Sequence, residues 1–180
     1  MSEVNLSKLK KLFQEKKYSE IVMDIELKTT EDDRSPALHN LLGVCRASQK
    51  GKSDRDVTHA LNDFEAAFYK DNLGELSLEA LCNHIKLCAE MGRKDSDLVN
   101  NLLTSEKMYI EAEKKYSKNI KYLTYGIDLY KYLLKHDKII SKIEEVINLK
   151  SLDETYGTLY ITSQMYLNNW DQKNFKEFQK

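Results

Sequence analysis

The sequence has little proline, glycine and cysteine, with one Pro, six Gly and three Cys among 180 residues. So few turn-forming residues argue against sandwiches of many short strands and against collagen-like or linker-like segments. Three cysteines are an odd number without the spacing of a disulfide framework, which favours a reducing compartment, so we expect a cytoplasmic protein. The longest apolar runs, such as 41–45, are far shorter than the about 20 residues that a membrane helix needs.

The chain also has no large excess of positive or negative charge. Lys and Arg number 28 and Asp and Glu number 29, which gives a formal net charge of -1 at pH 7. This balance removes the simplest electrostatic reason to expect a nucleic acid or an anionic membrane as partner. The first residues show no basic segment followed by an apolar run, so no secretory signal is recognised. Hydrophobic residues make up 41% of the chain, enough for one domain with a sizeable core.

Apolar residues recur at spacings of three and four along almost the whole chain, which predicts an all-α protein. The connections between successive segments are short, so neighbouring helices are expected to form antiparallel hairpins. We expect about ten helices in five hairpins. The expected helices lie around 6–13, 21–25, 36–48, 57–70, 76–91, 96–116, 119–136, 138–148 and 151–167, with a last one from Asp171.

Residues that favour helix ends mark several of these boundaries. Ser35 directly precedes Pro36, which predicts an N-cap followed by proline at the first helical position. Ser19 is the predicted N-cap of the second helix. The segment 151–154 fits a capping box, and 72–74 is expected to end the fourth helix.

The second hairpin combines Leu41, Leu42 and Gly43 with the later Ala60, Phe64 and Ala67. This pattern resembles the tetratricopeptide repeat (TPR), most fully over 35–72 and with departures over 6–92. One departure is a longer turn, since about five extra residues separate Gly43 from Ala60. In the TPR family the leucine-glycine step lets two helices approach closely, and small and aromatic residues of the next helix fill the space. We therefore expect Gly43 at a close helix crossing, with Phe64 packed into it.

The resemblance implies a right-handed solenoid of about five TPR-like hairpins over 1–168, with 169–180 as the start of a further helix. It also implies a concave wall formed by the first helix of each hairpin, where a peptide or partner helix would bind. Some TPR proteins hold a peptide's terminal carboxylate there, and Asn40, Asn83 and Lys86 supply part of such a clamp. The residues expected on the wall are Asn40, Val44, Ala47, Glu79, Asn83 and Lys86, extended by Tyr122 and Tyr125.

The tyrosines allow two interpretations. Tyr122, Tyr125, Leu129 and Tyr132 recur at three or four, which is the spacing of one helix face. Tyrosine often buries its ring while its hydroxyl reaches water, so this face can be a core stripe. Tyrosine is also enriched at binding hot spots, so the same face can be an aromatic part of a peptide-binding groove.

Two hypotheses of function follow. The first is a non-catalytic protein-interaction module, a monomer or weak homodimer, that binds a peptide or partner protein in a concave groove. The second starts from the chain end at 175–180, which falls inside a helical pattern and suggests a fragment. The chain would then be the substrate-presenting region of a larger bacterial transferase (a glycosyltransferase, sulfotransferase or methyltransferase). The segment 159–175, with Met165-Tyr166 and Trp170-Asp171, resembles the junction before the catalytic part of SPINDLY-like O-GlcNAc transferases.

Motifs for catalysis or metal binding are incomplete. The segment 51–53 (Gly-Lys-Ser) lacks the earlier glycine and the preceding strand of a phosphate-binding loop. His84 and Cys88 share a helix face, but Cys82 points elsewhere, and two ligands do not close a tetrahedral site. No third group orients this Cys–His pair as a nucleophile. The other histidines are on separate expected helices: His39, His59 and His136.

The densest basic patch is formed by Lys114, Lys115, Lys118 and Lys121, and four tyrosines interleave with it over 109–125. Such a mixture can bind single-stranded nucleic acid. Glu106, Glu111 and Glu113 share the segment, which indicates an exposed helix face with charges of both signs. We therefore expect no catalytic residue, metal, cofactor, nucleic acid or membrane partner.

Overall fold

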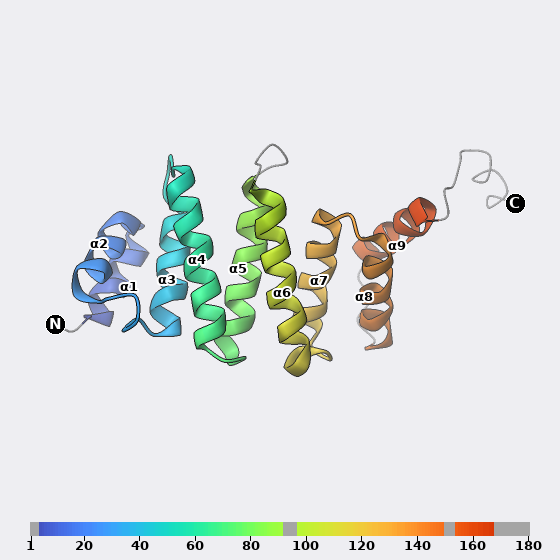
Figure 1. Cartoon of the computed structure of the whole chain (residues 1–180), viewed down its shortest axis with the longest axis horizontal. Helices are drawn as coiled ribbons and strands as arrows, with labels where there is room; N and C mark the ends of the chain where they lie inside the picture. Colours follow the sequence, from blue (N-terminus) through green and yellow to red (C-terminus); the bar gives the residue numbers. More distant parts are fainter. Residues whose placement is uncertain (1–3, 92–96, 150–153, 168–180) are drawn as a thin grey trace, which may run out of the picture. The chain divides into compact units, whose positions relative to one another are not determined.

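The computed structural model describes residues 4–91, 97–149 and 154–167 (Figure 1). These ranges contain nine α-helices and no strand, which confirms the all-α class. The expected helix from Asp171 and most of the expected capping box at 151–154 lie outside the described residues, and the solenoid arrangement stays a prediction. The helices are α1 (Leu6–Gln14), α2 (Tyr18–Lys28), α3 (Pro36–Ala47), α4 (Asp54–Lys70), α5 (Glu75–Met91), α6 (Leu98–Tyr116), α7 (Ile120–Tyr132), α8 (His136–Asn148) and α9 (Glu154–Leu167).

The chain divides into two compact units, Met1–Ala112 (unit 1) and Glu113–Lys180 (unit 2). Within unit 1, α2 packs against α1 and α3, and α4 packs against α3 and α5. Helix α3 also reaches α5 directly, and Figure 1 shows α3, α4 and α5 next to one another. Within unit 2, α8 packs against α7 and α9. The sequence predicted one domain over 1–168, and no pattern in it indicated this division.

The predicted cap of α3 is confirmed. The Ser35 hydroxyl accepts a hydrogen bond from the Leu38 backbone N–H at 3.3 Å, and Pro36 is the first helical residue. The predicted Ser19 cap is wrong, because α2 already begins at Tyr18 with Lys17 as an N-cap that makes no side-chain capping bond.

Two further boundaries differ from the sequence prediction. Helix α4 begins at Asp54, three residues earlier than expected, because Ser53 and Asp56 form a capping box. The expected helix 119–136 ends at Tyr132, and His136 begins α8 instead. Leu134 between them has φ 56, a left-handed backbone conformation that stops a right-handed helix.

The predicted close crossing of α3 and α4 is confirmed. A Cβ atom on Gly43 would lie 2.5 Å from Cε1 of Phe64, a distance that real Cβ contacts do not reach. The Phe64 ring is buried, with 1% of its surface exposed. The missing side chain of Gly43 is therefore the reason that the ring fits between these helices.

None of the helices in the described ranges combines the length and the hydropathy that crossing a bilayer requires.

Candidate functional site

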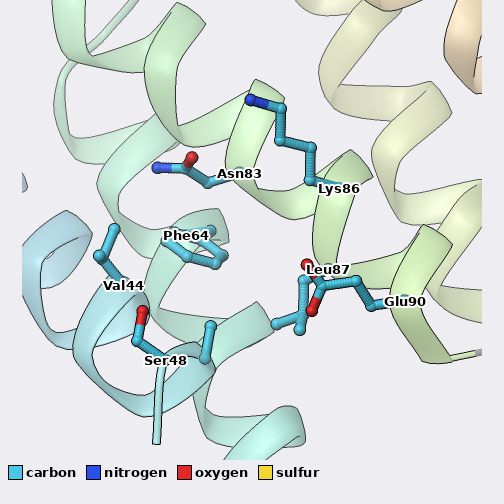
Figure 2. Close-up of a pocket in the computed structure, with 8 residues that line it drawn as sticks. Val44, Ser48, Phe64, Asn83, Lys86, Leu87 and Glu90 are labelled. Carbon is cyan, nitrogen blue, oxygen red and sulfur yellow. The ribbon is translucent and has the colours of Figure 1, made fainter.

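A pocket of about 160 Å³ opens in unit 1 between the second half of α3 and α5 (Figure 2). We call it the α3–α5 pocket. Four of the residues predicted to bind a partner line it, namely Val44, Ala47, Asn83 and Lys86. The complete lining is Val44, Ala47, Ser48, Phe64, Asn83, Lys86, Leu87 and Glu90. The structure therefore brings together residues of two helices that are about forty positions apart in the sequence.

The inner part of the pocket is apolar. Val44 and Ala47 are three residues apart on α3, so both face α5. Leu87 faces them from α5, and the Phe64 ring of α4 lies between Val44 and Leu87 (Figure 2). Because Phe64 is almost fully buried, it forms the deep side of the pocket. This inner part suits an aliphatic side chain.

A chain of hydrogen bonds fixes the amide at the pocket edge. The Asn83 amide nitrogen donates to Asn40 Oδ1 at 3.2 Å, and the Asn40 amide nitrogen donates to Glu79 Oε1 at 2.8 Å. Asn40 is only 6% exposed, and its side-chain oxygen holds the Asn83 amide in place. The Asn83 side-chain oxygen and its second N–H have no partner among the described residues, so they can accept from and donate to a peptide backbone.

The charge left at the pocket edge is positive. Lys52 Nζ forms an ion pair with Glu90 at 3.2 Å and donates to the Ala47 carbonyl oxygen at 2.9 Å. Glu90 is thus already paired. Lys86 is exposed, and within the described ranges it makes no hydrogen bond or ion pair. A ligand carboxylate beside the aliphatic side chain would therefore find a free ammonium group.

The two predicted tyrosines belong to unit 2, whereas the α3–α5 pocket belongs to unit 1. Tyr122 has no exposed surface, so it offers nothing for a partner to touch, and we leave it out of the candidate site. Leu129 of the same face is buried too, as expected for a core stripe. Tyr125 is partly buried.

Sequence reasoning did not assign Ser48, Leu87 and Glu90 to the site, and it gave Phe64 only a packing role. Glu90 follows Lys86 by four residues, so it continues the helix face that the sequence predicted from Glu79, Asn83 and Lys86. Its position in the site could therefore have been predicted from the sequence. Ser48 and Leu87 need knowledge of how α3 and α5 pair, which the sequence does not provide.

A polar cluster joins α2, α3 and α4, and three of its members, His39, Arg46 and Asp63, are buried. His39 Nδ1 lies 3.2 Å from Asp63 Oδ1, and Arg46 pairs with both Asp63 and Glu26. Lys70 Nζ donates to the carbonyl oxygens of three residues in the α2–α3 loop at 2.8 to 3.2 Å: Glu31, Asp32 and Arg34. Each charge here has a partner, so the cluster holds the three helices together.

The Cys–His pair of α5 is buried. His84 Nδ1 lies 2.7 Å from Ser105 Oγ, and Cys88 Sγ lies 3.7 Å from the same nitrogen, so His84 and Cys88 do share a face. Burial lowers the pKa of His84 to about 4 and raises the pKa of the Cys88 thiol to about 11. A neutral thiol is a weak nucleophile, which argues against covalent catalysis by Cys88. In the parts of the chain that the structure describes, no three His, Cys, Asp or Glu residues gather as metal ligands.

In comparisons with known proteins, no family model matches the chain, and neither a curated protein nor a solved structure gives a match.

Proposed function

We propose that this chain is a TPR-like protein-interaction module that binds an extended peptide segment of a partner protein in the α3–α5 pocket. The observation that carries the proposal is the convergence of Val44, Ala47, Asn83 and Lys86 on one pocket. The packing of Phe64 over Gly43, which the TPR resemblance implies, supports the family assignment.

The pocket favours a particular kind of peptide. Its apolar inner part takes one aliphatic side chain, and the Asn83 amide pairs with the peptide backbone beside it. The free ammonium group of Lys86 favours an acidic residue next to that aliphatic one. We expect an affinity of roughly micromolar, because a single small pocket contributes few buried contacts.

A peptide-display selection tests the proposal. The full chain is immobilised, random peptides are selected, and the enriched peptides are measured by fluorescence anisotropy on the wild type and on Lys86→Glu. We expect enrichment of an aliphatic residue next to Asp or Glu, and a loss of about tenfold or more in affinity for Lys86→Glu.

Lys107→Glu is the matched control, since Lys107 is an exposed lysine of α6 that does not line the pocket. It should leave the affinity within about twofold of the wild type. The proposal fails if Lys86→Glu binds the enriched peptides as tightly as Lys107→Glu does. It also fails if the enriched peptides carry no aliphatic residue.

A further inference from the structure

A second cavity in unit 1 lies between the α1–α2 turn and the end of α3. Its volume is about 540 Å³, and it is lined by Lys16, Tyr18, Ser19, Ser48, Gln49 and Lys50. It shares only Ser48 with the α3–α5 pocket and contains none of the four residues, Val44, Ala47, Asn83 and Lys86, on which the proposed peptide binding rests. We call it the turn cavity.

All the charged side chains that line the turn cavity are positive. Two lysines, three hydroxyl groups and one amide line it, and no carboxylate does. The nearby carboxylate of Glu15 is engaged by Lys17 at 2.9 Å. Within the described ranges, the six lining side chains form no hydrogen bond or ion pair with other protein groups. Their donors are therefore available to an anion.

The backbone fixes the position of Lys16 at this cavity. Lys16 has φ 57, its N–H donates to the Phe13 carbonyl oxygen at 3.0 Å, and the Lys17 N–H donates to the Leu12 carbonyl oxygen at 2.9 Å. This bonding pattern is a Schellman motif, which ends α1 in a defined conformation. The Tyr18 ring packs edge-on against Phe13 with ring centroids 5.6 Å apart, so it too is held in place.

We propose that the turn cavity binds a small phosphorylated molecule, with its phosphoryl group between Lys16 and Lys50. Lysine ammonium groups and hydroxyls are donors that match a phosphate's acceptor oxygens. A volume of about 540 Å³ is within the range of small-molecule sites and exceeds what a lone phosphate would fill. The rest of the ligand would therefore lie along the flat ring of Tyr18. The first backbone N–H groups of α2 add to the favourable potential but do not define the site.

Isothermal titration calorimetry on the full chain tests this proposal with three probes: adenosine 5′-monophosphate, adenosine and inorganic phosphate. We expect saturable binding of the monophosphate, weaker binding of inorganic phosphate and no binding of adenosine. Raising the salt from about 50 to about 300 mM should weaken the binding, since the contacts are ionic and exposed.

The variant Lys16→Asn with Lys50→Gln removes both charges, and asparagine tolerates the left-handed backbone at position 16. This double variant should bind the monophosphate about tenfold more weakly or worse, whereas the control Lys107→Gln should bind it like the wild type. Circular dichroism checks that each variant is folded. Unchanged affinity in the double variant overturns the site, as does equal binding of adenosine and its monophosphate. Equal affinity for inorganic phosphate overturns the assignment to an organic phosphate, and an absence of saturation below about 5 mM overturns binding altogether.

Discussion

Phe64 connects the packing of unit 1 with its candidate site. One side of its ring occupies the space that Gly43 leaves open, and the ring also forms the deep side of the α3–α5 pocket. The sequence predicted the first role, because the leucine-glycine step and the aromatic residue belong to one resemblance. It did not predict the second, which depends on how α5 lies against α3.

Replacement of Phe64 by alanine is expected to lower the free energy of unfolding by about 3–5 kcal/mol, since it removes a fully buried ring. Urea denaturation followed by circular dichroism measures this change. Leu27→Ala is the control: Leu27 is 79% exposed, so it should change stability by less than about 0.5 kcal/mol. A loss below about 1 kcal/mol for Phe64→Ala would show that the ring is not packed as described.

Gly43 and Phe64 should also be coupled energetically. Gly43→Ala places a Cβ against the ring and should destabilise unit 1 by about 1–3 kcal/mol. In a Phe64→Leu background the clash is relieved, so the same substitution should cost less by about 1 kcal/mol in a double-mutant cycle. Additive costs in this cycle would contradict the close approach of the two residues.

His84 makes stability depend on pH in a defined direction. Burial lowers its pKa from the ordinary 6.5 to about 4, so between these values the unfolded chain binds more protons than the folded one. The free energy of unfolding should therefore fall as the pH is lowered from about 6.5 toward 4, by up to about 1 kcal/mol per pH unit. Urea denaturation at several pH values measures this slope.

The variant His84→Gln should have a shallower slope in this pH window, and His59→Gln, which changes an exposed histidine, should keep the wild-type slope. Identical slopes for the wild type and His84→Gln would mean that the imidazole is not buried in its neutral form.

At the scale of the element, local chemistry decided which helix ends were predictable. The Ser35–Pro36 start of α3 was recognised because a cap and a first-turn proline are neighbours in the sequence. The break between α7 and α8 was misplaced because Leu134, which is not glycine, adopts the left-handed conformation there. Sequence patterns associate that conformation with glycine or asparagine, so a leucine gives no warning.

The cap that was predicted for α2 and the cap that is observed at α4 provide a test. Ser53→Ala removes a hydroxyl that accepts from the Asp56 N–H at 3.3 Å, and it should cost about 1 kcal/mol of unfolding free energy. Ser19→Ala should leave stability unchanged or slightly raised, since Ser19 lies inside α2 and caps nothing. Chemical denaturation distinguishes these outcomes. A larger loss for Ser19→Ala than for Ser53→Ala would reverse our assignment of the two helix starts.

At the scale of the whole molecule, both cavities lie in unit 1. The all-α class and most helices were predictable because a 3.6-residue period survives in almost every segment. The side of α5 that lines the α3–α5 pocket was predictable for the same reason. The buried cluster of His39, Asp63 and Arg46 was not, because its members come from two helices and meet only after α3 and α4 pair. The spacing of the tyrosines left two interpretations open, because a core stripe and a binding surface have the same spacing, and the burial of Tyr122 and Leu129 fits the core stripe.

The most direct measurement of the central claim is a nuclear magnetic resonance titration of the full chain with a peptide from the display selection. Our account predicts that the largest backbone-amide shifts occur at the pocket residues of α3 and α5, including Val44, Ala47, Asn83 and Lys86. Amides of the described residues 117–149 and 154–167 in unit 2 should stay unshifted. Shifts that are largest in unit 2, or that avoid α3 and α5, would contradict the assignment of peptide binding to the α3–α5 pocket.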